Sequence, residues 1–189
     1  TVTGSEMPMR TQVGIIGSGP AGLMLSHLLH LQGISSIIIE NRSREYIEQR
    51  NRAGLIEQWA ANMKTETGVR LRMAREGMYH DGNYLCFNGE AHHINFRKLV
   101  GKGITIYGQQ EVVKDLVARR LADGGQIVFE VADTKVHDIG TDKPFITFRQ
   151  SGKDGGKEER IDCDYIAGCD GFHGICRPSF PEGVLTFFD

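Results

Sequence analysis

The chain has 189 residues, of which 40% are hydrophobic, and its 24 acidic and 22 basic side chains give a net charge of −2. This length favours one domain with at most a small appended layer, and the near-neutral charge without a basic stripe argues against a nucleic-acid or anionic membrane partner. No apolar run approaches the roughly 18 to 20 residues of a membrane span. Residues 1–8 lack the apolar core of a signal peptide and are expected to be a leader or an expression remnant, so we predict a cytoplasmic protein.

The cysteines and histidines do not form a metal-binding pattern. The four cysteines are Cys86, Cys163, Cys169 and Cys176. They contain no CxxC pair and suit no common zinc site, so we expect free thiols in a reducing compartment. The adjacent His92 and His93 would point to opposite faces of a strand. We therefore predict ordinary strand residues there and no metal site.

A glycine-rich turn, Gly-Ser-Gly-Pro-Ala-Gly, occupies residues 17–22 between a predicted strand and a predicted helix. This context is typical of a dinucleotide-binding turn, although a purely structural glycine turn is the alternative. Gly17 permits a tight turn, Gly19 lets the backbone approach a pyrophosphate, and Gly22 allows the helix to pack close to the sheet. The unpaired N–H groups of the first helical turn, which includes Ala21, would face the phosphates.

Glu40 closes a second predicted strand, residues 36–39, about 20 positions beyond the glycine turn. An acidic residue at this point accepts hydrogen bonds from ribose hydroxyls. Its charge disfavours a 2′-phosphate, so the sequence favours FAD or NAD over NADP at this first site.

The remainder of the chain predicts an α/β fold. Asn88-Gly89 predicts a β-hairpin, because both turn positions must accept a positive φ. The other expected elements are a helix over residues 53–63, hairpin strands over 79–87 and 90–96, a strand over 104–107 and a helix over 109–121. Runs at 126–136, 145–150 and 159–163 predict an antiparallel meander across one face of the parallel sheet. Residues 164–169 predict another central strand, and residues 184–189 a final apolar strand.

Four motifs together resemble the class A flavoprotein aromatic monooxygenases, and most closely the members that hydroxylate 4-hydroxybenzoate. They are residues 17–22 with Glu40, residues 50–58, residues 107–109 and residues 163–174. The resemblance implies a Rossmann-like FAD-binding domain with a parallel sheet, helices, a β-meander and a β-hairpin insertion. Residues 9–180 would be its N-terminal portion and residues 181–189 the start of a strand, with the chain truncated before the substrate domain.

The resemblance also implies which residues bind cofactors. The FAD contacts would be Gly17, Gly19, Ala21, Gly22, Glu40, Arg50, Arg52, Ala53, Gly54, Leu55, Gln109, Asp170 and Gly171. Guanidinium groups suit phosphate contacts because they offer several fixed donors and remain charged. Arg42, Tyr46 and His173 are similar to residues that bind the electron donor, with NADPH or NADH both open.

The implied activity belongs to the complete enzyme. NAD(P)H would reduce FAD, and the reduced flavin would react with O₂ to a C4a-hydroperoxide that converts 4-hydroxybenzoate to 3,4-dihydroxybenzoate. No catalytic residue is expected in this chain, which should be inactive alone and retain FAD weakly. We also expect a homodimer, with pairing through residues 184–188. The alternatives are a hydroxylase of 3-hydroxybenzoate or salicylate, and a non-catalytic dinucleotide-binding module.

Overall fold

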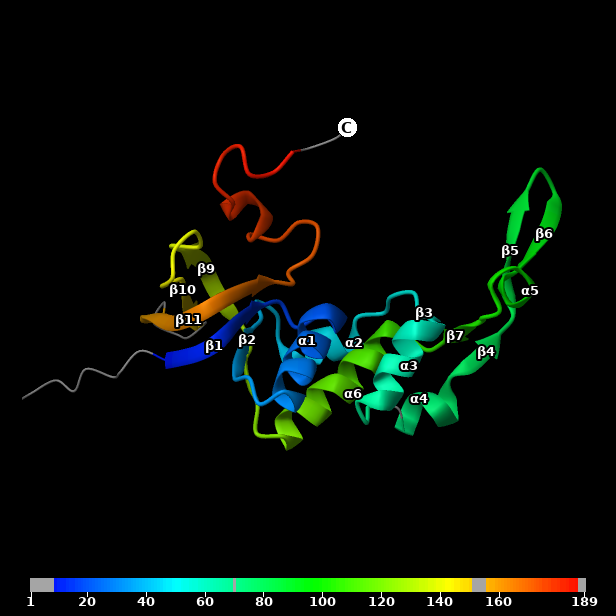
Figure 1. The fold of residues 1–189 in the computed structure, drawn as a ribbon, viewed down its shortest axis with the longest axis horizontal. Coiled ribbons are helices and arrows are strands. Elements are labelled where there is room, and N and C mark those ends of the chain that lie inside the picture. Colours follow the sequence, from blue (N-terminus) through cyan, green and yellow to red (C-terminus); the bar gives the residue numbers. More distant parts are fainter. Residues whose placement is uncertain (1–8, 70, 151–155, 187–189) are drawn as a thin grey trace, which may run out of the picture. The chain divides into compact units, whose positions relative to one another are not determined.

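The computed structural model describes residues 9–69, 71–150 and 156–186, so the expected leader lies outside the described residues (Figure 1). The chain divides into two compact units. Unit 1 comprises residues 1–47 and 117–189, and unit 2 comprises Glu48–Leu116.

Unit 1 is built on a six-stranded sheet in the order β8-β2-β1-β11-β10-β9. Its strands are β1 (Met9–Ile16), β2 (Ser36–Ile39), β8 (Gln126–Val128), β9 (Val131–His137), β10 (Phe145–Gln150) and β11 (Glu158–Gly168). The first four in the order run parallel to one another, and β9 and β10 complete the sheet in antiparallel fashion. β2 reads Ser-Ile-Ile-Ile and is buried throughout, as a central parallel strand covered on both faces requires.

One face of the parallel strands is covered by α1 (Pro20–Leu31), whose Leu23 is fully buried. The last residues of α6 (Gln109–Ala122) also belong to this unit, where the guanidinium of Arg120 donates to the Ser36 carbonyl at 3.0 Å. The short helices α2 (Arg44–Gln49) and η1 (Arg177–Ser179) follow the ends of β2 and β11.

The opposite face is covered by the meander of β9, β10 and the first half of β11. Ile146 and Phe148 of β10 pack in one core cluster with Ile16, Ile37 and Ile39 of the parallel strands. The strand β11 pairs with β10 over residues 158–162 and with β1 from Ile161 to Gly168, so this one strand joins the meander to the parallel sheet. The predicted α/β architecture and meander are confirmed.

Two strand boundaries in unit 1 differ from expectation. The run at residues 126–136 is split at Glu130, which has φ +58°, so that β8 joins the parallel edge and β9 the meander. The runs at 159–163 and 164–169 form the single long strand β11. The expected final strand is absent from residues 184–186, and the other positions of that run lie outside the described residues.

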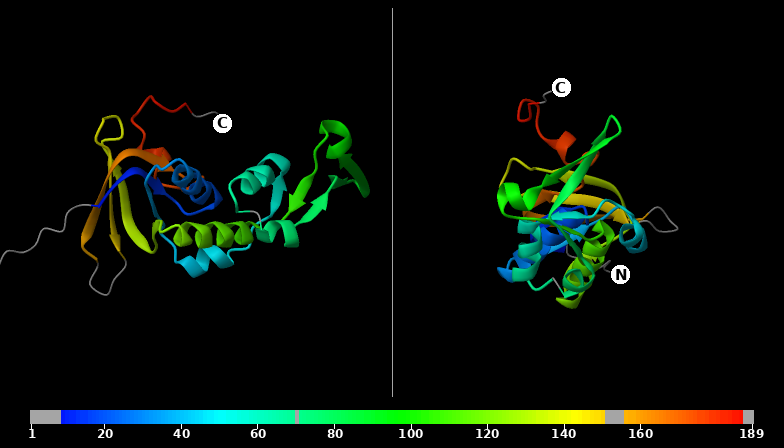
Figure 2. Two further views of the ribbon diagram at one scale, coloured as in Figure 1. Left: turned by 60° about the horizontal axis from the view of Figure 1, so that its bottom comes forward. Right: turned by 90° about the vertical axis from the view of Figure 1, so that its right-hand side faces the viewer.

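Unit 2 contains a three-stranded antiparallel sheet in the order β3-β7-β4 and a separate hairpin (Figure 2). The strands are β3 (Leu55–Glu57), β4 (Met78–His80), β5 (Gly82–Phe87), β6 (Glu90–Asn95) and β7 (Ile104–Ile106). The helices are α3 (Gln58–Glu66), α4 (Leu71–Glu76), α5 (Phe96–Val100) and the beginning of α6.

The helix predicted over residues 53–63 is wrong at its start. Leu55 pairs with Ile106 in β7, and α3 begins only at Gln58. Cross-strand pairing has overridden the local helical pattern.

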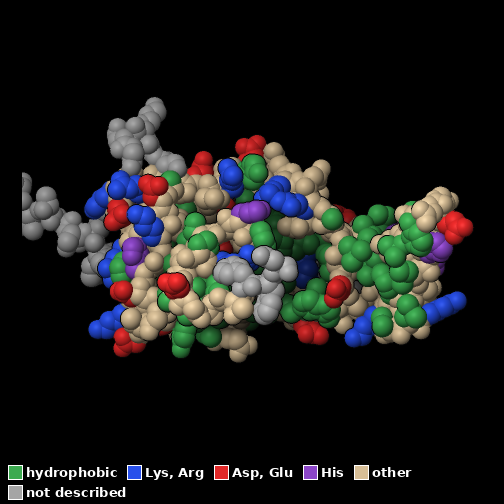
Figure 3. Space-filling model, turned by 90° about the horizontal axis from the view of Figure 1, so that it is seen from above, with side chains coloured by type: hydrophobic (Ala, Val, Ile, Leu, Met, Phe, Trp, Pro, Cys, Tyr) green, Lys and Arg blue, Asp and Glu red, His purple; other side chains and the backbone are tan. Residues whose placement is uncertain are grey.

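The hairpin turn is confirmed, with φ of +51° at Asn88 and +79° at Gly89. The first expected hairpin strand is shorter than predicted, because Met78–His80 forms β4 and pairs with β7. His92 stacks on Phe87 with ring centroids 4.4 Å apart, whereas His93 contacts Tyr84. Hydrophobic side chains gather over this end of unit 2 (Figure 3), in agreement with the exposure of Tyr84, Leu85 and Phe87.

The four cysteines are free, and their environments predict different reactivity. Cys163 is 2% exposed, and burial raises the pKa of its thiol to about 11, whereas Cys86 is exposed on the hairpin. Since the thiolate is the nucleophile, an alkylating reagent at about pH 8 will modify Cys86 first and leave Cys163 unmodified until the protein unfolds. Peptide mass spectrometry over a time course measures both sites. Equal rates at Cys86 and Cys163 in the native protein would contradict the buried placement of β11.

No helix within the described ranges is long and apolar enough to cross a membrane.

Candidate functional site

The carboxyl ends of β1, β2 and β11 lie side by side because these strands are parallel neighbours. The Gly17 N–H donates to the Ile39 carbonyl at 2.9 Å, and the Cys169 N–H donates to the Ile16 carbonyl at 2.8 Å. The glycine turn after β1 therefore lies between the segments that follow β2 and β11. Ligands of open parallel sheets bind at this edge.

The three glycines of the turn differ in what surrounds them. Gly17 has φ +102°, which favours glycine, and a side chain there would collide with the Cys169 backbone. A side chain on Gly22 would collide with the Gly17 carbonyl oxygen. Gly19 instead faces open space, and a methyl group added to it would meet no atom within 4 Å. The turn thus leaves a bare stretch of backbone accessible at Gly19.

The N-terminus of α1 follows this open space. Gly19 is the N-cap residue, Pro20 is the first helical residue, and the cap makes no side-chain hydrogen bond. The first turn of α1 contains no acidic residue that would compete for its N–H groups. These orphan donors and the positive end of the helix dipole fit a phosphate group.

The Glu40 carboxylate ties β2 to the glycine turn. It accepts hydrogen bonds from the Ser18 N–H and hydroxyl, both at 2.8 Å, and from the Arg42 N–H at 2.9 Å. A carboxylate has about four acceptor positions, so capacity remains for a ribose hydroxyl. Ser18 is fully buried. The glycine pattern of the turn does not predict that Ser18 holds the Glu40 carboxylate.

Asp170 closes the loop that follows β11. Its carboxylate accepts a hydrogen bond from the Cys176 N–H at 3.0 Å, and a side chain on Gly174 would collide with it. Gly171 has φ +78° and faces open space. Burial, together with the hydrogen bond to Asp170, raises the pKa of Cys176 to about 12, so this thiol stays protonated.

The other predicted flavin contacts belong to unit 2. The Tyr107 N–H donates to the Gly54 carbonyl at 2.7 Å, and a side chain on Gly54 would collide with the Tyr107 carbonyl oxygen. Leu55 begins β3 immediately afterwards, and Gln109 begins α6 two residues beyond Tyr107. Gly54, Leu55 and Gln109 therefore lie near one another in unit 2. The exposed residues Arg50, Arg52 and Ala53 precede it in the segment between α2 and β3.

The predicted electron-donor contacts lie on two separate elements of unit 1. The Arg42 guanidinium lies 5.2 Å from the centre of the Tyr46 ring, in a cation–π contact at the start of α2. His173 is exposed in the loop after Asp170, where its ring packs edge-on against Phe172 at 4.9 Å.

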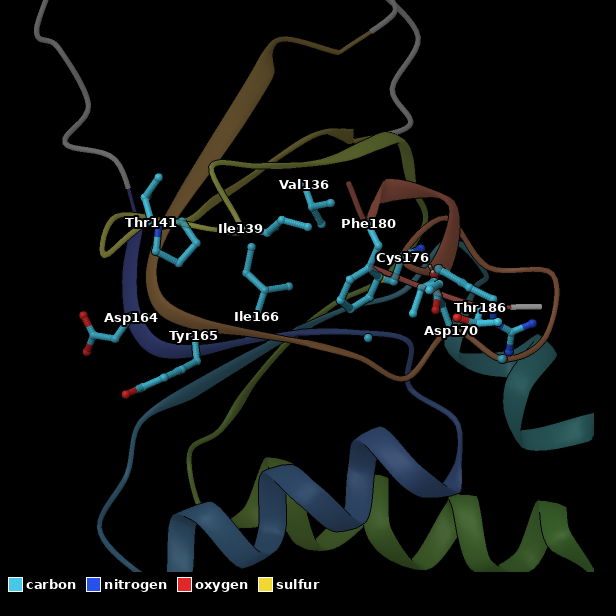
Figure 4. A pocket seen from close by; sticks show the side chains of 15 residues that line it. Val136, Ile139, Thr141, Asp164, Tyr165, Ile166, Asp170, Cys176, Phe180 and Thr186 are labelled. Carbon is cyan, nitrogen blue, oxygen red and sulfur yellow. Dashed lines mark hydrogen bonds between the residues drawn. The ribbon is translucent and has the colours of Figure 1, made fainter. Parts of the chain in front are cut away.

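A cavity of about 850 Å³ lies between the meander and the second half of β11 (Figure 4). The side chains of Val136, Ile139, Ile166 and Phe180 gather around it, and Asp170 lines its other end. Within the described residues, no group of three or more His, Cys, Asp or Glu side chains is placed to hold a metal ion.

Residues 10–187 match the sequence profile of the FAD binding domain family, so the chain belongs to that family. It is 40% identical over 182 residues to the p-hydroxybenzoate hydroxylase of Acinetobacter baylyi. That alignment covers 96% of this chain and 44% of the relative, so the chain spans less than half of the relative's length. The predicted FAD-binding domain and its resemblance to a p-hydroxybenzoate hydroxylase are confirmed.

Solved structures show the same fold at low sequence identity. The p-nitrophenol 4-monooxygenase PnpA of Pseudomonas putida has a TM-score of 0.73 and 19% identity, over 92% of this chain and 44% of that one. The flavin-dependent monooxygenase PieE, solved with FAD and substrate, has a TM-score of 0.70 and 18% identity, over 91% and 32%. The Diels-Alderase PyrE3 has a TM-score of 0.70 and 23% identity, over 89% and 34%. The fold alone therefore does not define the reaction.

Proposed function

We propose that this chain binds the ADP half of FAD within an NAD(P)H-dependent monooxygenase that converts 4-hydroxybenzoate to 3,4-dihydroxybenzoate. The observation that carries the FAD assignment is the open backbone at Gly19, placed between the N-terminus of α1 and the anchored Glu40 carboxylate. The 40% identity to a p-hydroxybenzoate hydroxylase supports the substrate assignment.

Each residue of the proposed site has a physical role. The N–H groups at the start of α1 bind the pyrophosphate beside Gly19, and Glu40 accepts from the ribose. In unit 2, Arg50 and Arg52 donate to phosphate oxygens, while the backbone around Gly54 and the Gln109 side chain line the flavin and its ribityl chain. Asp170 and Gly171 complete the cofactor contacts in unit 1. We assign the NAD(P)H contacts to Arg42, Tyr46 and His173.

FAD, when bound, supplies the redox and oxygen-activating chemistry, whereas the protein supplies position and electrostatics. We assign no catalytic acid or base to this chain, because its proposed contacts serve the cofactor. Binding and orienting FAD are therefore the functions that its residues would perform in the reaction.

The 189-residue chain alone will form no 3,4-dihydroxybenzoate from 4-hydroxybenzoate, NADPH and O₂, because its alignment covers only 44% of the length of the relative. Product analysis by chromatography measures this directly. Product formed by the pure chain would contradict the proposal that the residues of this chain only bind and orient FAD.

A chimera tests the function itself. The matching 182 residues of the Acinetobacter relative are replaced by this chain, and NADPH-dependent formation of 3,4-dihydroxybenzoate is measured. We expect a flavin-loaded, active chimera. A folded chimera that binds no FAD would overturn the cofactor assignment, and one that binds FAD but consumes NADPH without hydroxylation would overturn the assigned reaction.

A further inference from the structure

Unit 2 contains a buried charged network that none of the proposed cofactor contacts includes. Lys64 on α3 is 2% exposed, and its ammonium lies 3.5 Å from Oδ2 of Asp115 on α6. The same oxygen accepts a hydrogen bond from the Tyr107 hydroxyl at 2.9 Å. The Lys64 ammonium also lies 5.1 Å from the centre of the Tyr107 ring.

Burial deprives the Lys64 ammonium of hydration by water. Burial lowers the pKa of Lys64, and the Asp115 carboxylate offsets the shift only in part. Among the described residues, the buried ammonium has no hydrogen-bond partner that meets the usual geometry. An apolar side chain would fill the same space without this cost, so core packing alone does not account for Lys64.

The other charges around Lys64 come from α4 and α6. Arg72 pairs with Glu111 and Glu76, and its guanidinium lies 3.4 Å from Oδ1 of Asp115. Lys114 pairs with Glu111 at 2.8 Å. Asp115 thus keeps a cationic neighbour when Lys64 is replaced.

Tyr107 links this network to the proposed flavin contacts. Its side chain contacts Lys64, Asp115 and the Arg72 guanidinium, which lies 5.9 Å from the centre of the ring, while its backbone N–H is bonded to Gly54. Gly54 fits closely against the Tyr107 carbonyl and leaves no room for a side chain. Tyr107 therefore connects the charged network, through its side chain, to Gly54, through its backbone, and it lies two residues before the start of α6 at Gln109.

We infer that Lys64 and Asp115 are positioning residues of the flavin-contacting segments in unit 2, a role that rests on the proposed FAD-binding function. They hold the Tyr107 ring and thereby fix the spacing between Gly54 and Gln109. They touch neither FAD nor substrate in this assignment.

The test compares Lys64→Met and Asp115→Asn with the wild type and with Lys102→Met, the same change at an exposed lysine of unit 2. Fluorescence of Trp59, the only tryptophan of the chain, reports whether unit 2 remains folded. Hydrogen exchange of the Tyr107 amide reports the bond to Gly54. Titrations with FAD and with ADP separate the flavin contacts from the ADP contacts.

We expect Lys64→Met to remain folded, to exchange the Tyr107 amide about tenfold faster and to bind FAD about tenfold more weakly, with ADP affinity close to wild type. Asp115→Asn should behave similarly, and Lys102→Met should match the wild type. Wild-type exchange and FAD affinity in a folded Lys64→Met protein would overturn the inference. If Lys64→Met does not fold, Asp115→Asn decides by the same readouts.

The pH dependence gives a readout that a packing defect would not change. As the pH rises through the lowered pKa of Lys64, its ammonium becomes neutral and the ion pair with Asp115 is lost. Tyr107 stays protonated in this range, because burial raises its pKa to about 12. FAD affinity relative to ADP affinity should therefore decline as the pH rises in the wild type and stay constant in Lys64→Met. Equal pH dependence in the two proteins would overturn the inference.

If the wild type binds no FAD at any pH, the proposed function fails, while the exchange of the Tyr107 amide still decides whether Lys64 holds Tyr107.

Discussion

Gly19→Ala will weaken FAD binding by about tenfold or more while leaving the fold intact. The added methyl group meets no protein atom within 4 Å, and Gly19 has φ −70°, which alanine adopts readily. The folded protein should therefore lose no more than about 1 kcal/mol, the scale of an unfavourable N-cap residue. In the proposed complex, however, the methyl occupies space needed by the pyrophosphate, and losing one or two charge-assisted hydrogen bonds accounts for the weaker affinity.

Gly33→Ala is the matched control, because it is also a glycine in open space but lies beyond the C-terminal end of α1. Its φ of +71° makes alanine unfavourable by roughly 1 kcal/mol, so stability should fall while FAD affinity stays constant. FAD titration by flavin fluorescence and urea unfolding by circular dichroism separate the two patterns. An unchanged FAD affinity in Gly19→Ala would contradict the assignment of the glycine turn to the cofactor site.

Glu40→Ala will destabilise unit 1 by about 2–4 kcal/mol and also weaken FAD binding. The substitution leaves the buried Ser18 N–H and hydroxyl without their acceptor, and it frees the Arg42 N–H. Glu40→Gln retains one acceptor oxygen and should show a smaller loss of stability. Urea unfolding measures the free energy of unfolding for both variants.

The control for Glu40 is Glu182→Ala, because Glu182 is exposed and lies outside the proposed site. It should change neither stability nor FAD affinity. A Glu40→Ala protein as stable as the Glu182→Ala protein would contradict the anchoring of the glycine turn by Glu40.

The sequence predicted the parts of the fold that depend on local chemistry. The turns at Gly17 and at Asn88-Gly89 require backbone conformations that favour glycine or asparagine, and the structure has positive φ at all three residues. The strand β10 was predicted with its observed bounds, because its apolar run is limited by turn residues on both sides.

Interactions between distant residues were not predictable from local pattern. The local pattern assigned β3 to a helix, since its pairing with β7 joins segments about fifty residues apart. The hydrogen bonds from Ser18 to Glu40 span 22 positions and depend on the two strands being neighbours. The burial of Lys64 beside Asp115 likewise requires α3 and α6 to pack together, and a lone lysine in an amphipathic segment gave no indication of it.

The central claim is that this chain holds the ADP half of FAD at the glycine turn and Glu40. Calorimetric titration of the purified 189-residue chain with ADP, followed by FAD in the presence of saturating ADP, tests it most directly. We predict one ADP site per chain, abolished or strongly weakened in Gly19→Ala, and competition between ADP and FAD for that site. No ADP binding, or FAD binding unaffected by ADP, would contradict the claim.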